Sequence, residues 1–165
     1  MMSPSTGQSS FPKSAVLSVL MVGAGAAGVG ISRQIRHLVE AAGGPTDPSQ
    51  YLAMFDTAGL VTLDRPDLED HKIEFARPNT GEPSDLVPFI DAFRPTVLVG
   101  TTGQPRIFDE TVIRTMARHV DRPVVMALSN PTSKTEGVPA EIIACSQGKA
   151  LIATGSPFEP VEYGD

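Results

Sequence analysis

The stretch Val16–Gly28, VLSVLMVGAGAAG, decides the fold, because an apolar strand-like run passes directly into the pattern G-x-G-x-x-G. In such a junction the first glycine makes a tight turn, the second lets the backbone approach a pyrophosphate, and the third lets the following helix pack close to the strand. The helix N-terminus adds unpaired N–H groups and a positive dipole end. The stretch therefore predicts a dinucleotide site built on Gly23, Ala24, Gly25, Ala26, Ala27 and Gly28.

Two other interpretations of this segment stay open, because residues 15–31 carry no charge. A membrane span is one, although the run is shorter than about 20 residues and rich in glycine. A secretory signal is the other, with Lys13 as its charged start and residues 24–26 as its cleavage site. Against both, the segment continues as an amphipathic helix. Its apolar face is predicted to hold Ile31, Ile35, Leu38, Val39 and Ala42.

Length and composition set the broad class of the chain. Its 165 residues fit one domain, and we expect residues 1–14 to be a disordered lead-in and residues 15–165 to be that domain. The net charge of −6, without a basic stripe, argues against nucleic acid as a partner. The single Cys145 cannot form an internal disulfide, which is typical of a reducing, cytoplasmic setting. We expect this thiol to be buried and inert.

Strand and helix patterns alternate after the first helix. Strands are predicted at residues 51–55, 96–99, 124–128 and 150–153, with a short extended piece at 60–63. Helices are predicted from Ser84 or Asp85 to Phe93, from Asp109 onward, and from Pro139 to about Ser146. The charged, Pro/Gly-rich residues 64–83 are predicted to be a long surface connection. This series predicts an α/β fold with a doubly wound, mostly parallel, Rossmann-like sheet.

Ligands of such sheets lie beyond the carboxyl ends of the strands, so the residues that follow each strand are candidates for the site. Asp56 ends the second strand, where a carboxylate would accept hydrogen bonds from the adenosine ribose, although a plain turn residue is the alternative. Thr101 and Thr102 follow the third strand in a loop of small residues, which is also compatible with an ordinary glycine-rich loop. Ser129 and Asn130 follow the fourth. The Asn130 amide suits a nicotinamide ribose or a small hydroxy acid, and an Asn-Pro turn is the alternative.

Five segments in this order resemble the NAD(P)-binding domain of malic enzymes. They read GAGAAGVGI at 23–31, DTAGL at 56–60, PTVLVG at 95–100, ALSNPTSKTE at 127–136 and ATGSPFEPV at 153–161. LSNPTS and GSPFEPV are the most specific of them. Malic enzymes oxidise L-malate with NAD or NADP and decarboxylate it with Mg²⁺ or Mn²⁺, which gives pyruvate and CO₂. The resemblance implies that Asn130 contacts both the coenzyme and the substrate.

The choice of coenzyme follows from three residues. Asp56 alone favours a free 2′-hydroxyl, since it would repel a 2′-phosphate. In NADP-preferring malic enzymes a hydroxyl residue follows this acid and a lysine shortly precedes a Phe-Ala pair. Thr57 and Lys72, ahead of Phe75 and Ala76, occupy those places. NADP is therefore slightly favoured over NAD, although Lys72 is equally compatible with a solvated loop lysine.

The catalytic residues of the family have no counterparts in the matching segments. Its proton-transferring tyrosine and lysine lie in an earlier domain, and its acidic metal ligands precede the first strand, whereas Met1–Lys13 contains no Asp or Glu. We therefore expect no catalytic residue and no metal ligand here, and Mg²⁺ or Mn²⁺ only in a complete enzyme. The expected partners are the dinucleotide and either a missing catalytic domain or a second copy of the chain. The expected setting is cytoplasmic, with a mitochondrial one open for a complete enzyme. A non-catalytic dinucleotide-binding or sensing module is the alternative.

Overall fold

A computed structural model describes residues 17–164, so the predicted lead-in at 1–14 lies outside the described residues. The strands are β1 Val19–Val22, β2 Leu52–Asp56, β3 Gly59–Leu60, β4 Val97–Gly100, β5 Val124–Ala127 and β6 Leu151–Thr154. The α-helices are α1 Ala26–Ala41, α2 Asp70–Ile73, α3 Leu86–Phe93, α4 Glu110–His119 and α5 Pro139–Cys145. Single turns of 3₁₀ helix lie at Pro48–Gln50 and Thr132–Lys134.

The strands form one sheet in the order β3-β2-β1-β4-β5-β6. All neighbours pair in parallel except β3, which returns antiparallel against β2. The chain therefore leaves β1 toward β2 on one side and resumes on the other side with β4, so that the strand order reverses at β1. This reversal is the switch point at which doubly wound sheets bind their ligands. The predicted fold class is confirmed.

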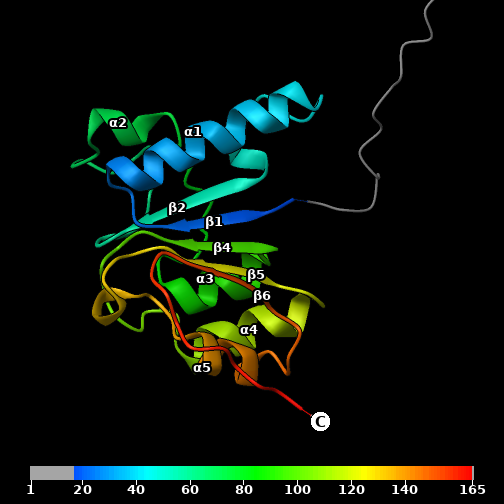
Figure 1. Cartoon of the computed structure of the whole chain (residues 1–165). Helices are drawn as coiled ribbons and strands as arrows, with labels where there is room; N and C mark the ends of the chain where they lie inside the picture. The colour runs from blue at the N-terminus through cyan, green and yellow to red at the C-terminus, as the bar shows by residue number, and fades with distance from the viewer. Residues whose placement is uncertain (1–16, 165) are drawn as a thin grey trace, which may run out of the picture.

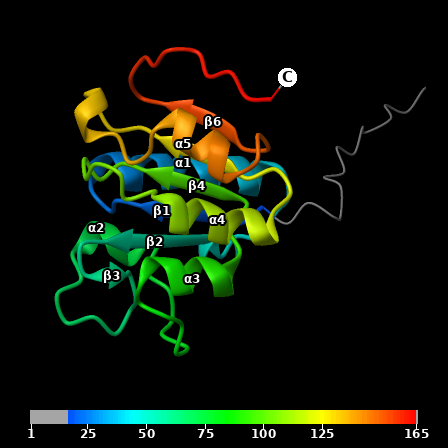
Figure 2. The ribbon, with the colours of Figure 1, turned by 90° about the horizontal axis from the view of Figure 1, so that it is seen from below.

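Helices cover both faces of the sheet. Figure 1 shows α1 and α2 on one face and α3, α4 and α5 on the other, and the view in Figure 2 separates the strands from β3 to β6. Because β1 is covered on both faces, all four of its residues are buried, as expected for a central parallel strand. None of the helices within residues 17–164 is long and apolar enough to cross a membrane.

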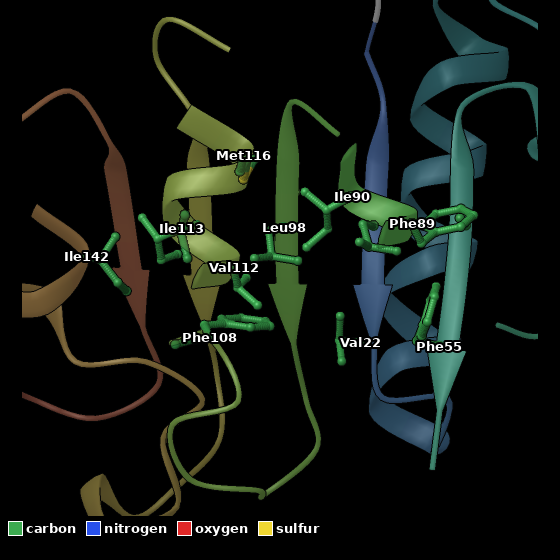
Figure 3. Packing of buried hydrophobic residues seen from close by; sticks show 14 of the residues in the cluster. Val22, Phe55, Phe89, Ile90, Leu98, Phe108, Val112, Ile113, Met116 and Ile142 are labelled. Atoms are coloured by element: carbon green, nitrogen blue, oxygen red, sulfur yellow. The ribbon is translucent and has the colours of Figure 1, made fainter. Parts of the chain in front are cut away.

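The larger core lies between the sheet and helices α3, α4 and α5. Figure 3 shows strand residues that point into the same layer as helix residues from the opposite side. Phe55 of β2 meets Phe89 of α3 edge to face, with ring centroids 5.1 Å apart. The Asp109 carboxylate accepts a hydrogen bond from the backbone N–H of Val112 (2.9 Å), so the predicted N-cap of α4 is confirmed.

The apolar face predicted for α1 is partly wrong. Its buried residues are Gly28, Val29 and Ser32, whereas Leu38 is 70% exposed. Ile31, Ile35 and Val39 pack against the core, so most of the predicted face is confirmed and Leu38 is the exception. Gly28 and Ser32 extend the same face toward the glycine loop, which Gly28 approaches so closely that no side chain fits between them.

Residues 64–83 are not the plain surface connection that the sequence predicts. They contain α2, and Phe75 is buried against the β1–β2 side of the sheet. Glu74 forms ion pairs with Arg33 and Arg36 of α1, which tie α2 to that helix. The Arg77 guanidinium donates hydrogen bonds to the carbonyl groups of residues 49 and 52. The segment therefore covers one end of α1 instead of running over the surface.

Candidate functional site

The glycine loop joins β1 to α1, and its three glycines differ in what they permit. Gly23 has φ +116°, and a Cβ there would lie 2.6 Å from the Thr101 hydroxyl oxygen. A Cβ on Gly28 would overlap the carbonyl oxygen of Gly23. A Cβ on Gly25, by contrast, would meet no other atom of residues 17–164 within 4 Å. Gly23 and Gly28 thus serve the packing of the loop, whereas Gly25 leaves open space in front of the N-terminus of α1.

That open space belongs to a cavity of about 760 Å³ at the carboxyl ends of the strands. This volume lies within the range of cofactor sites, ~300–1,000 Å³. The end of β2, helix α2, the start of α3 and the loop after β4 enclose the cavity together with the glycine loop. The predicted site residues that line it are Gly23, Ala24, Gly25, Ala26, Asp56, Thr57, Lys72, Thr101 and Thr102. The cavity does not include Ala27, Gly28, Ser129 or Asn130.

The positive end of α1 faces this cavity without a side-chain cap. Gly25 is the N-cap residue, and among residues 17–164 no side chain accepts from the first turn and no acidic residue stands in it. A helix N-terminus whose N–H groups and dipole remain uncompensated favours an anion. The loop is therefore suited to a phosphate or pyrophosphate, as the sequence motif predicts.

Asp56 lies at the cavity wall and holds two cations. Its Oδ1 accepts hydrogen bonds from Arg65 (2.9 Å) and from the backbone N–H of Ala58 (2.9 Å), and its Oδ2 accepts one from Lys72 (2.8 Å). All three charged side chains are at least five-sixths buried. Burial raises the pKa of Asp56, but the hydrogen bonds from Arg65 and Lys72 outweigh it and hold the pKa at about 2. Asp56 is therefore ionised throughout the physiological range.

A carboxylate offers about four lone-pair positions, and the three donors leave roughly one of them free. One acceptor position on Asp56 therefore has no donor among residues 17–164. Lys72 also pairs with Glu69 (2.6 Å) and Arg65 with Asp67 (3.4 Å), but Glu69 and Asp67 are more than half exposed. The partly buried part of this cluster, Asp56 with Arg65 and Lys72, thus carries a net positive charge.

Helix α2 also contacts the glycine loop. The Nε2 atom of His71 lies 3.2 Å from the carbonyl oxygen of Ala24, which can only accept a hydrogen bond. In this contact the ring nitrogen therefore donates. Because both His71 and Lys72 belong to α2, the short helix connects the glycine loop with Asp56.

A second group of polar contacts joins the loops after β4 and β5. Glu136 is fully buried, and its carboxylate accepts hydrogen bonds from the backbone N–H and hydroxyl of Thr102 (2.7 and 3.1 Å). It also accepts from the backbone N–H of Gly103 (3.3 Å) and from the backbone N–H (3.2 Å) and hydroxyl of Ser129. Burial raises the pKa of Glu136, but these hydrogen bonds outweigh it and the pKa is lowered.

Asn130 lies outside the cavity but is held in a defined orientation. Its Oδ1 accepts a hydrogen bond from the Ser156 hydroxyl (2.6 Å), and the carbonyl of Ser156 accepts one from Thr154 (2.8 Å). With its oxygen on Ser156, the amide of exposed Asn130 keeps its two N–H donors for other partners. The loops after β5 and β6 also touch, since a Cβ on Gly155 would overlap the carbonyl oxygen of Leu128.

Arg65, His71 and Glu136 belong to these contacts but were not predicted from the sequence. Arg65 and His71 lie in the segment interpreted as a surface connection, where charged residues are ordinary. Glu136 closes the segment ALSNPTSKTE, but its partners Thr102 and Ser129 become its neighbours only when β4 and β5 pair. Among residues 17–164, no three His, Cys, Asp or Glu side chains converge in a metal-binding arrangement.

Comparisons with known proteins agree with this geometry. Residues 10–165 match the family profile described as malic enzyme, NAD binding domain. The chain is 42% identical over 156 residues to an NAD-dependent malic enzyme of Acinetobacter baylyi, covering 88% of this chain and 27% of that protein. It is 40% identical over 154 residues to an NAD-dependent malic enzyme of Aeromonas hydrophila, with the same two coverages.

A solved structure described as a malic enzyme candidate (malate oxidoreductase) has the same fold. It superposes with a TM-score of 0.59 at 21% identity, over 84% of this chain and 33% of that one. The chain spans about a quarter of the length of the curated relatives that it matches. Because the profile match extends over nearly the whole chain, the protein belongs to the malic enzyme NAD-binding domain family.

Proposed function

We propose that the chain binds a nicotinamide dinucleotide in the cavity, with the diphosphate at the glycine loop. The observation that carries this proposal is Gly25, whose open side faces the cavity at an uncapped helix N-terminus. A Cβ at that position would occupy space that no protein atom uses. The backbone of Gly25 can therefore approach a phosphate closely, and the dipole of α1 stabilises its charge.

The direction of the bound dinucleotide follows from the charged groups. The free acceptor position of Asp56 suits a ribose hydroxyl, so the adenosine half lies along the β2 side of the cavity. The nicotinamide half then extends across β1 toward the loops after β4 and β5, where Thr101 and Thr102 line the cavity. Asn130 follows β5 further along this path, and its amide oxygen is held by Ser156.

We propose that the site accepts both NAD and NADP. NAD is supported by the free lone-pair position of Asp56 and by the curated relatives, which are named as NAD-dependent. NADP is supported by Lys72 and Arg65, since both cations lie at the end of β2 and can pair with a 2′-phosphate. Glu69, which lines the cavity and pairs with Lys72 (2.6 Å), would have to release that cation to the phosphate.

We further propose that the complete protein oxidises L-malate and decarboxylates the product to pyruvate and CO₂. In that reaction the nicotinamide would accept a hydride while a base takes the hydroxyl proton of malate, and Mg²⁺ or Mn²⁺ would stabilise as a Lewis acid the enolate that is left by CO₂ and is then protonated to pyruvate. This chain contributes the coenzyme site. The metal ligands and proton-transferring groups are assigned to other segments, either of a longer protein or of a partner.

Calorimetric titration of the purified chain with NAD and NADP tests the coenzyme site. Gly25→Ala is expected to weaken both coenzymes at least tenfold, because the methyl group occupies the diphosphate path. It should change stability by no more than about 1 kcal/mol, the usual difference between Gly and Ala at an N-cap. Gly30→Ala is the matched control, since a Cβ there also meets no protein atom but lies a turn further along α1. Absence of binding to the wild type at millimolar coenzyme, or unchanged binding to Gly25→Ala, would overturn the proposal.

A further inference from the structure

The buried carboxylate of Glu136 is not explained by the packing of the core. Its side chain forms no salt bridge with any residue of the described range 17–164. A buried charge without a counter-ion is costly unless several donors solvate it. Five donors do so here, and all of them come from the loops after β4 and β5.

The two hydroxyl groups next to Glu136 are fully used within the protein. The Thr102 hydroxyl donates to Glu136 and accepts from the backbone N–H of Gln104 (2.9 Å). The Ser129 hydroxyl donates to Glu136 and accepts from the backbone N–H of Gly103 (2.9 Å). Each hydroxyl has a single proton, so neither can donate to a ligand in this arrangement. Thr102 and Ser129 therefore act through the backbone that they hold in place.

The Glu136 side chain also occupies space that a side chain at the end of β4 would need. A Cβ on Gly100, the last residue of β4, would lie 2.5 Å from Cγ of Glu136 and 2.8 Å from the ring of Phe108. The end of β4 thus has room either for this glutamate or for a side chain of its own. Asn130, the next residue after Ser129, is itself held through its side chain by the Ser156 hydroxyl.

We infer that Glu136 is a positioning residue for the nicotinamide half of the coenzyme site, because it locks the loops after β4 and β5 to one another. This inference rests on the proposed function, since it needs a dinucleotide that reaches from Asp56 across β1. The adenosine half does not depend on Glu136, whose partners all lie on the β4–β5 side of the switch point. Loss of the Glu136 hydrogen bonds should therefore weaken the binding of the nicotinamide half more than the binding of the adenosine half.

Glu136→Gln is the sharpest variant, because it keeps the shape but replaces one acceptor oxygen by an NH₂ group that faces N–H and O–H donors. Glu136→Asp keeps the charge but moves it back by one methylene group, so it should retain part of the NAD affinity that Glu136→Gln loses. Glu141→Gln is the matched control, since Glu141 is half-exposed on α5 and pairs with exposed Arg106.

The test compares the binding of NAD with that of ADP, which lacks the nicotinamide riboside. We expect Glu136→Gln to weaken NAD at least tenfold and ADP less than twofold, with Glu136→Asp between the wild type and Glu136→Gln. A purely structural role predicts equal losses for both ligands. Hydrogen exchange gives a readout without ligand: the amides of Thr102, Gly103 and Ser129 should exchange at least tenfold faster in Glu136→Gln, while those of β1 should not change.

The outcomes separate the two proposals. Equal weakening of NAD and ADP, or unchanged exchange at the three amides with NAD binding retained, would overturn the role of Glu136 alone. If the wild type bound neither NAD nor ADP, the proposed function would fail, and the coenzyme role of Glu136 with it.

Discussion

Replacing Asp56 by Asn removes the one carboxylate that holds both Arg65 and Lys72 at the cavity wall. The amide loses its charge and can accept through only one oxygen, so at least one of the two cations loses its buried partner. Lys72 retains Glu69 and Arg65 retains Asp67, but both of these acids are more than half exposed. The substitution therefore leaves two partly buried cations with weak compensation.

The pKa of Asp56 sets the size of the expected effect. Folding lowers this pKa from 3.8 to about 2. A shift of about 1.8 pKa units corresponds to about 2 kcal/mol of stability that depends on the ionised carboxylate. Since the folded pKa is the lower one, the contribution is fully present above about pH 4 and is lost as the pH falls toward about 2. Asp56→Asn should thus be less stable than the wild type by about 2 kcal/mol at pH 7, and the difference should shrink between pH 4 and pH 2.

Urea unfolding at pH 7, 4 and 2.5 measures this difference directly. Asp121→Asn is the matched control, because Asp121 is 95% exposed and its contact with Lys149 is 3.4 Å long. An exposed pair of this kind is worth less than ~1 kcal/mol and should show little change with pH. Calorimetry on the same samples should show that Asp56→Asn binds NADP relatively better than NAD, since the variant no longer repels a 2′-phosphate.

A loss below about 0.5 kcal/mol at pH 7, within the range of ordinary surface substitutions, would refute the assignment of Asp56 as the partner of both cations. A loss that stayed constant from pH 7 to pH 2.5 would refute its electrostatic cause and point to packing instead.

Two further substitutions test neighbouring parts of the site. Gly28→Ala should destabilise the chain by about 1–3 kcal/mol or more in urea unfolding, because its Cβ overlaps the carbonyl oxygen of Gly23. Gly30→Ala in the same helix should stabilise the chain by ~0.5–1 kcal/mol. Equal effects of the two substitutions on stability would contradict the close approach of α1 to β1. Lys72→Gln should lower the affinity for NADP about tenfold, or about 1.4 kcal/mol, relative to that for NAD in calorimetric titration. An unchanged ratio of the two affinities would show that Lys72 only neutralises Asp56.

Local sequence patterns were sufficient for most of the fold. The apolar run before Gly23 became β1, and the Asp109 cap and the Pro139 start of a helix appear where the sequence predicts them. Such signals depend on residues a few positions apart, so they can be interpreted without knowing what else is nearby. On α1 the periodic face holds for Ile31, Ile35 and Val39, whereas Leu38 at its edge is 70% exposed, because periodicity does not fix how wide a face the neighbouring strands cover.

Only the part of the site that follows strand ends could be predicted from local patterns. The glycine loop and Asp56 each sit at the end of a strand, and the parallel sheet brings all such ends to one edge. Among the partners of Asp56, Lys72 was predicted only from the family resemblance and Arg65 was not predicted, because both occupy a charged segment whose path depends on the burial of Phe75 and on the contacts of Arg77.

By itself the sequence determined that the chain alternates strands and helices, that a tight glycine turn follows the first strand, and that an acid ends the second. Only the tertiary structure decided which charges meet. Glu136 and Thr102 are 34 residues apart and come within 2.7 Å because β4 and β5 pair in register. The physical reason is that periodicity and turn chemistry act over a few residues, whereas a buried charge requires several donors at once, which only the folded chain can bring together.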